Sequence, residues 1–373
     1  WPHELSKLEP DPDIVFDRLE NGFRYALMKN KYPENRTAIY LNINAGSLHE
    51  KENERGVAHF LEHMVFNGST HFKAGELIDY FQAIGMSFGA DTNGYTTYSD
   101  TVYKIILPGS NKTMLGDGLL VMGDYARGAT LEQTEIERER GVVLAEMNER
   151  NNASYRASQA RTSFLYNGTL LPHRFAIGTQ QVLKQADRER IKGFYDRWYR
   201  PDNMVLVMVG DFDLGDARSL VERQFAHLKT ANELFDCPDY GGVNHTGIKS
   251  FHYSDPDLGY TTVSIGRVGN KQPVNDSFDY QVETIQRYMA ARIINFRLAE
   301  ELESSSSFMS SARYVFGSTL DRYQQSSIIS HTSRDHWQDA LKILNRILKQ
   351  ALTYGFNDDE ISMIKNELVS ELK

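Results

Sequence analysis

The order of sequence patterns repeats along the chain, and this repeat restricts the fold more than any other feature. An alternating apolar run at 259–269 resembles the run at 37–47, and each is followed by a helical pattern and two further strand-like runs. The stretch at 353–373 then resembles the charged stretch at 127–149. A repeated order of strands and helices predicts two similar α+β domains.

The predicted boundaries follow from this repeat. They are an N-terminal extension at 1–12, a first domain at 13–228, a polar linker at 229–250 and a second domain at 251–373. The second copy stops inside its last recognisable helix, whereas the first continues well beyond the equivalent point. The second domain is therefore expected to be incomplete, and the natural protein to be longer.

Hydrophobic periodicity predicts the individual elements. The predicted helices are 54–66, 74–85, 112–128, 131–158, 186–199, 213–227, 278–303 and 335–354. The predicted strands are 37–47, 87–96, 99–107, 203–212, 259–269, 308–317 and 324–332. Two more strands are predicted within 14–29, joined by a turn at Asn21 and Gly22, because Asn-Gly is the strongest short hairpin signal.

Composition excludes several classes of protein. The chain has 41 basic and 50 acidic residues, a net charge of -9, whereas a nucleic-acid-binding domain is usually basic. No apolar run approaches the roughly 20 residues that cross a bilayer. The one cysteine, Cys237, allows no intrachain disulfide and is more often a packed small residue than a nucleophile. The chain begins at Trp1, and its first residues are typical of a mature exported protein, so a periplasmic or otherwise exported location is expected.

The run HFLEH at 59–63 places three polar side chains on one face of an otherwise apolar helix. Residues three and four apart share a helix face, so His59, Glu62 and His63 project together. Two histidines at this spacing can bind one metal ion, and imidazole is the commonest zinc ligand. Glu62 is placed to accept a proton from a bound water without being a ligand. The alternative is a pair of histidines that line a surface helix, but the full five-residue spacing favours the metal.

A catalytic zinc ion takes three protein ligands, so a third is needed. The charged helix predicted at 131–158 offers Glu132, Glu135, Glu137, Glu139, Glu146 and Glu149. Glu139 and Glu146 lie two turns apart on one side, next to Val142 and Val143, which mark an inward face. A carboxylate beside buried valine is costly unless it is paired or bound to metal. Glu146 is therefore predicted as the third ligand, and Glu139 as an acceptor that orients a histidine or a water.

With these residues in place, the chain resembles the pitrilysin-type (M16) family of zinc metallopeptidases. HFLEH is the inverted zinc motif H-x-x-E-H, and ERERGVVLAEMNE at 137–149 carries the family's two glutamates seven residues apart. The run at 89–108 also resembles the family's strands after the motif helix. The resemblance covers nearly the whole chain, and its details are most similar to bacterial periplasmic zinc protease members.

The resemblance implies a mixed sheet flanked by helices in each of two related domains. It implies one zinc ion per chain held by His59, His63 and Glu146, with Glu62 as general base. It implies extended or unfolded peptide substrates that add as a strand to a sheet edge. Asn93 and Gly94 fall where family members contact the substrate backbone, although an irregular strand is the simpler interpretation of these two.

The resemblance also implies a partner and one point of departure. A complete family chamber takes two two-domain halves, fused or separate, and this chain would supply the half that binds zinc. Many members carry an Arg and a Tyr that bind the substrate carbonyl. The candidates here, Arg297, Arg313 and Tyr314, match that pattern poorly.

Three hypotheses follow from the sequence. The first is a zinc endopeptidase of extended peptides. The second is a non-catalytic peptide-binding or assembly subunit of the same fold, which would usually have lost part of the His–Glu–His set. The third is a structural zinc site, which would need a fourth protein ligand that the sequence does not offer. The intact set favours the enzyme.

Overall fold

The computed structural model describes residues 1–230, 237–304 and 308–372. The chain divides into two compact units, which are considered separately. The six-stranded unit comprises Asp11–Asn152 and Leu170–Gly241. The three-stranded unit comprises Trp1–Pro10, Ala153–Thr169 and Gly242–Lys373.

The six-stranded unit is built on a mixed sheet. Its strands are β1 (Ile14–Arg18), β2 (Arg24–Lys29), β3 (Thr37–Ile43), β4 (Thr92–Thr96), β5 (Thr101–Leu107) and β6 (Met204–Gly210). Their order across the sheet is β1-β2-β6-β3-β5-β4, so β4 lies at an edge. Only the pair of β2 and β6 is parallel, and the other pairs are antiparallel.

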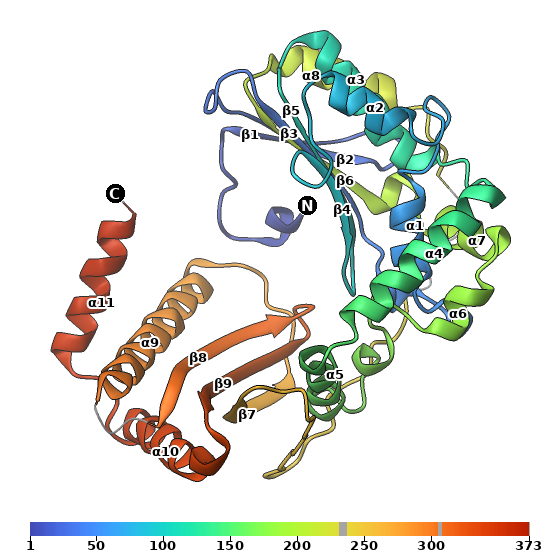
Figure 1. Ribbon diagram of the computed structural model, residues 1–373. Coiled ribbons are helices and arrows are strands. Elements are labelled where there is room, and N and C mark those ends of the chain that lie inside the picture. Colours follow the sequence, from blue (N-terminus) through green and yellow to red (C-terminus); the bar gives the residue numbers. More distant parts are fainter. Residues whose placement is uncertain (231–236, 305–307, 373) are drawn as a thin grey trace. The chain divides into compact units, whose positions relative to one another are not determined.

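One face of this sheet carries the core. Ile39, Leu41 and Ile43 alternate with less buried neighbours on β3, as period-two side-chain alternation requires. The helices are α1 (Val57–Met64), α2 (Glu76–Ala83), α3 (Lys112–Arg127), α4 (Gln133–Arg150), α6 (Gln180–Gln185), α7 (Arg188–Trp198) and α8 (Leu214–Phe225). In Figure 1, α2, α3 and α8 lie together on one side of the sheet, and α1 lies beside α4.

The prediction of one continuous helix at 131–158 is wrong. Helix α4 ends at Arg150, and a separate helix, α5 (Ala153–Leu165), follows in the other unit. Asn151 has φ −77° and ψ 53°, outside the helical region, and its amide donates to the Asn148 carbonyl at 3.2 Å. Asparagine favours turns and caps over helix interiors, so the Asn-Asn pair ends the helix.

The three-stranded unit carries β7 (Thr261–Asn270), β8 (Met309–Thr319) and β9 (Tyr323–Thr332), in the order β7-β9-β8. Both described pairs are antiparallel, so the mixed character expected of each sheet is found only in the six-stranded one. Helices α9 (Phe278–Glu303) and α10 (Trp337–Tyr354) pack on these strands, and α11 (Asp358–Glu371) follows. The α+β class is confirmed. None of the helices that the structure describes has both the length and the apolar character that a bilayer crossing requires.

Protonation of His49 is expected to destabilise the six-stranded unit. Burial lowers the pKa of this imidazole from 6.5 to about 4, and its Nδ1 accepts a hydrogen bond from the Gly46 amide at 3.1 Å. Between about pH 6.5 and pH 4, the unfolded chain therefore binds more protons than the folded chain. The free energy of unfolding falls as the pH falls through this window. Urea unfolding of metal-free protein from pH 7 to 4 measures this loss. The His49→Asn variant, whose Oδ1 can accept the Gly46 hydrogen bond, should lose about 3 kcal/mol less across the window. An equal loss in both proteins would show that His49 does not titrate there.

Candidate metal site

The helix that carries the histidines is anchored at its start by a buried carboxylate. Glu50 Oε2 accepts from the Gly56 amide at 2.9 Å, and Oε1 accepts from the Ala58 amide at 2.8 Å. These two donors belong to the first turn of α1, where backbone amides have no partner within the helix. Gly56 has φ +101°, a backbone conformation that favours glycine. The entry into α1 is therefore fixed by contacts independent of any metal.

Three potential ligands converge between α1 and α4. The Nε2 atoms of His59 and His63 are 3.3 Å apart, and Glu146 Oε2 lies 3.6 Å from the former and 3.5 Å from the latter. His59 is only 5% exposed. Among the described residues, no other group of three or more histidine, cysteine or acidic side chains is arranged to hold one ion.

The separations between these donor atoms fit a tetrahedral zinc ion. Zinc–nitrogen and zinc–oxygen distances of about 2.1 Å give edges of about 3.4 Å between ligand atoms in a tetrahedron. The three observed separations, from 3.3 to 3.6 Å, agree with that value. Three protein donors occupy three corners, which leaves the fourth for water or substrate.

The electrostatics of the site also favour a cation. Burial lowers the pKa of His63, but hydrogen bonds to Glu139 and Glu146 outweigh it and raise that pKa to about 9. Burial and the neighbouring His63 together lower the pKa of His59. The hydrogen bond from His63 lowers the pKa of Glu146. In the metal-free protein, His63 therefore holds a proton between the carboxylates of Glu139 and Glu146. A divalent cation would supply positive charge to His59, His63 and Glu146 alike.

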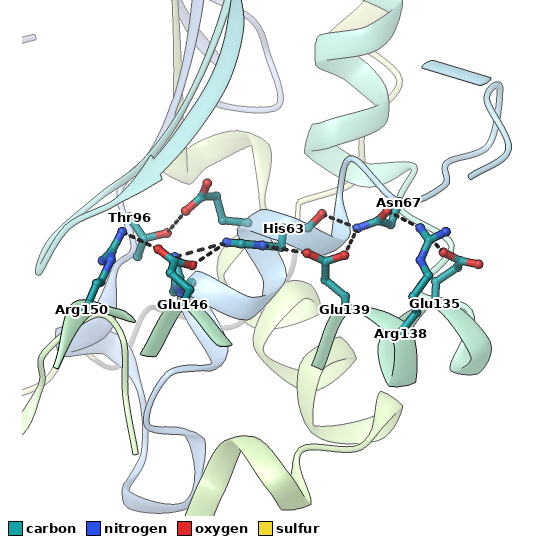
Figure 2. Close-up of polar contacts among 10 residues, drawn as sticks. His63, Asn67, Thr96, Glu135, Arg138, Glu139, Glu146 and Arg150 are labelled. Atoms are coloured by element: carbon teal, nitrogen blue, oxygen red, sulfur yellow. Dashed lines mark hydrogen bonds and ion pairs between the residues drawn. The ribbon is translucent and has the colours of Figure 1, made fainter. Parts of the chain in front are cut away.

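Glu139 contacts the outer nitrogen of a candidate ligand. Its Oε1 lies 2.8 Å from His63 Nδ1 (Figure 2), and the residue is 8% exposed. A carboxylate at this position accepts the Nδ1 proton, so Nε2 is the nitrogen that would ligate a metal ion. His59 Nδ1, in contrast, is buried without a hydrogen-bond partner among the described residues.

Glu62 lies on the same helix but outside the group of ligands. Its Oε2 accepts from Thr96 Oγ1 at 3.0 Å, and burial raises its pKa. The other oxygen, Oε1, lies against the backbone of Gly94 on the edge strand β4, where a Cβ atom would be only 2.9 Å away. The absence of a side chain at Gly94 therefore leaves the space that the Glu62 carboxylate occupies.

The remaining predicted residues are less involved. Asn93 is exposed, and its Oδ1 accepts from the Gly94 amide at 2.9 Å. Arg297 is tied to Glu360 at 2.6 Å within the three-stranded unit, which gives its guanidinium a structural role there. Arg313 and Tyr314 lie on β8 of that unit. Cys237 is exposed and free.

Three residues of this network were missed in the sequence. Thr96 bonds Glu62, Arg150 Nη2 lies 2.5 Å from Glu146 Oε1, and Asn67 contacts both His63 and Glu139. The i, i+4 spacing of Glu146 and Arg150 on one helix is a signal that could have indicated their pairing. Asn67 and Thr96 act across elements, and no local pattern marks such contacts.

Comparison with protein families matches two adjoining regions of the chain. The model for the insulinase family of peptidases (peptidase family M16) matches residues 25–175, which include all the residues of the candidate site. The model for the peptidase M16 inactive domain matches residues 185–368.

Individual proteins are similar over nearly the whole chain. The probable zinc protease PqqL of Escherichia coli is 30% identical over 98% of the chain, and that of Haemophilus influenzae is 29% identical over 94%. The crystal structure of the first half of the E. coli periplasmic protease PqqL superposes with a TM-score of 0.87 at 30% identity, with 98% of this chain and 78% of that one covered. The chain spans only 39% and 38% of the lengths of these two curated relatives.

Proposed function

Because the chain belongs to the insulinase family of peptidases, M16, we propose that it is the metal-binding half of a zinc-dependent endopeptidase that hydrolyses extended or unfolded peptides. The observation that carries the proposal is the convergence of His59, His63 and Glu146 at separations of 3.3 to 3.6 Å. The names of the PqqL relatives, probable zinc proteases, support the same activity.

In the proposed site, His59 Nε2, His63 Nε2 and Glu146 Oε2 hold one zinc ion per chain. Zinc bound there would supply Lewis acidity, which lowers the pKa of a bound water to about 7 and polarises the scissile carbonyl. Glu139 holds the proton of His63 at Nδ1, so that Nε2 stays a lone-pair donor. Arg150 occupies Glu146 Oε1, which leaves Oε2 directed to the histidines.

Glu62 is the proposed general base and acid. Its Oε2 is held by Thr96, so Oε1 is the oxygen that would take the proton of the attacking water and pass it to the leaving amine. The raised pKa of this buried carboxyl favours proton uptake relative to an exposed glutamate. A glutamate that must both accept and release a proton near neutral pH benefits from such a shift.

The edge strand β4 is the proposed place of the substrate backbone. It ends the sheet order and carries Asn93 and Gly94, of which Gly94 lies against Glu62. An exposed strand edge presents unpaired amides and carbonyls, to which an extended peptide can add as a further strand. A segment must be extended, with its own amides and carbonyls unpaired, to add along β4, so extended or unfolded peptides are the proposed class.

The alternatives are less well supported. A non-catalytic subunit of this fold would not need Glu62 beside the ligands, yet Glu62, His59, His63 and Glu146 are all present. A structural zinc site would need a fourth protein ligand. Within the described residues, the candidate group holds three.

We also infer that the chain carries two copies of one ancestral domain, with predicted limits of 13–228 and 251–373. The strand order β3-β5-β4 in one unit has the same connectivity as β7-β9-β8 in the other, which supports this inference. Because the chain spans 39% of the E. coli relative, a second two-domain half is the proposed partner, fused or separate. The periplasmic location of that relative supports export of this protein.

The test of the proposal combines metal analysis with peptide cleavage by the full-length protein. Wild-type protein is expected to hold about one zinc ion per copy of this chain and to lose activity when a chelator removes it. Cleavage that persists without metal would refute a zinc peptidase.

Enlarging Gly94 is expected to displace the Glu62 carboxylate. A Cβ at this position would lie 2.9 Å from Glu62 Oε1, closer than real contacts allow, and 3.1 Å from Cγ, a tight contact. Alanine requires a small shift, whereas the branched side chain of Gly94→Val fills the space. A misplaced catalytic group can cost about 100-fold in rate, so we expect Gly94→Val to lower kcat by about 10- to 100-fold and Gly94→Ala by less. Zinc content should stay unchanged, and equal kcat values in all three proteins would contradict this account.

A further inference from the structure

Asn67 lies just beyond the end of α1 and contacts both helices of the candidate metal site. Its Nδ2 donates to the His63 carbonyl at 3.1 Å and to Glu139 Oε2 at 3.0 Å (Figure 2). Its Oδ1 accepts from Arg138 Nη2 at 2.8 Å. Arg138 in turn lies 2.5 Å from Glu135. Both His63 and Glu139 therefore share one amide as a neighbour.

The chemistry of these partners fixes which way the Asn67 amide points. The two groups that face Nδ2, a carbonyl and a carboxylate, are acceptors, and the group that faces Oδ1 is a guanidinium, which can only donate. Turning the amide over would place oxygen against two acceptors and NH2 against Arg138. All three hydrogen bonds would be lost at once.

This fixed amide determines what Glu139 can do for His63. Glu139 Oε2 faces an N–H group and must accept, so no proton can lie on that oxygen. An ionised Glu139 accepts through both oxygens, so with Oε2 turned to Asn67, Oε1 accepts from His63 Nδ1 at 2.8 Å. His63 Nε2, which faces Glu146 Oε2 at 3.5 Å, is then the nitrogen that would ligate a metal ion.

Asn67 also ties together the two helices that supply the ligands. Its link to the His63 carbonyl, which also accepts from the Phe66 amide at 3.2 Å, belongs to the last turn of α1. Its links to Glu139 and Arg138 belong to α4, the helix that carries Glu146. The exposed Arg138 contacts the amide oxygen of Asn67, and Glu135 contacts Arg138 in turn.

We propose that Asn67 is a positioning residue for zinc binding: through Glu139 it keeps the His63 proton on Nδ1 and keeps α1 and α4 at the separation that one ion requires. The inference rests on the metal site proposed above. Asn67 acts through the direction of its hydrogen bonds, so a variant that reverses the direction of the bond to Glu139 tests the proposal.

The first variant is Asn67→Asp, in full-length protein. Aspartate has nearly the same shape and can still accept from Arg138, but it places an acceptor against Glu139 Oε2. We expect zinc affinity, measured by competition with a chelator, to fall by about 10- to 100-fold, the usual effect of losing a partner of a metal-bound side chain. An added negative charge near a cation should by itself strengthen binding. The Asn148→Asp variant controls for that charge, because Asn148 is exposed on α4, and it should bind zinc at least as tightly as wild type.

The second variant restores the pair with its polarity exchanged. In the double variant Asn67→Asp with Glu139→Gln, the glutamine NH2 can donate to Asp, and its oxygen can still accept from His63. The total charge equals that of wild type. We expect each single variant to bind zinc more weakly and the double variant to recover at least tenfold over the weaker single.

The outcomes separate this inference from the proposed function. Wild-type protein that binds no zinc would overturn both. Zinc binding in wild type with an unchanged affinity in Asn67→Asp, or with losses that multiply in the double variant, would overturn the role of Asn67 alone. Thermal unfolding of the metal-free variants shows whether each variant is folded. Recovery of zinc affinity in the double variant is a second control, because only a folded site can recover it.

Discussion

The Glu62→Gln variant of the full-length protein is expected to keep its zinc and lose peptide cleavage. Glutamine has the same shape and can keep a hydrogen bond to Thr96, but it cannot accept the proton of an attacking water. Loss of a general base typically costs about 10²- to 10⁴-fold in rate, so kcat should fall by that factor. Zinc content should remain near one per copy, because Glu62 is not among the convergent donors.

Measurement of cleavage and metal content on the same samples makes this test specific. Glu149→Gln is a matched control, since Glu149 is exposed on α4 and lies near the same site. It should resemble wild type in both measurements. Unchanged cleavage in Glu62→Gln would remove Glu62 from the reaction, whereas loss of zinc together with activity would mean that Glu62 binds or supports the metal.

The sequence predicts the local elements of the site well because its signals are local. The i, i+3, i+4 spacing of His59, Glu62 and His63 depends only on helix geometry, and α1 is present at Val57–Met64. The seven-residue spacing of Glu139 and Glu146 likewise depends only on α4. The structure adds what spacing cannot provide: the approach of α1 to α4 that brings Glu146 Oε2 within 3.6 Å of both histidines.

Contacts between distant segments were beyond a single sequence. The parallel pairing of β2 with β6 joins residues 181 positions apart (Arg24 with Val205), and no alternation pattern indicates its direction. Asn67 and Arg138 are 71 residues apart, and both are residue types that are common on protein surfaces. Polar side chains of this kind acquire a role only when the fold gives them a buried partner such as Glu139.

The break between α4 and α5 shows how the helix propensity of a long charged segment can hide a local turn signal in the sequence. The charged residues from 131 to 158 have strong helix propensity, and this favoured one long helix. The Asn151 and Asn152 pair opposes it, and the chain passes there from the six-stranded unit to the three-stranded one. The preference of asparagine for turns therefore marks the point at which the chain passes between the units. Helix propensity summed over a long segment hides this local preference.

Replacement of Glu146 by glutamine is expected to reduce zinc affinity more than any change in the surrounding network. Glutamine removes the negative charge and the strong donor oxygen that faces both histidines at about the 3.4 Å edge of a zinc tetrahedron. A partner such as Glu139 acts only through His63, and its loss typically costs about 10- to 100-fold in affinity. Loss of a direct ligand should exceed that range.

Chelator competition on Glu146→Gln, Glu139→Gln and Glu149→Gln would therefore rank the three glutamates of α4. The expected order of zinc affinity is Glu149→Gln equal to wild type, Glu139→Gln weaker and Glu146→Gln weakest. All three changes remove one negative charge from the same helix, so a ranking cannot arise from net charge. If the three variants bound zinc equally, affinity would depend on the field of the helix and not on ligation, and the third ligand would have to be sought elsewhere. If Glu139→Gln were the weakest, the roles of the two carboxylates would be exchanged, which the 2.8 Å contact of Glu139 with the outer nitrogen of His63 argues against.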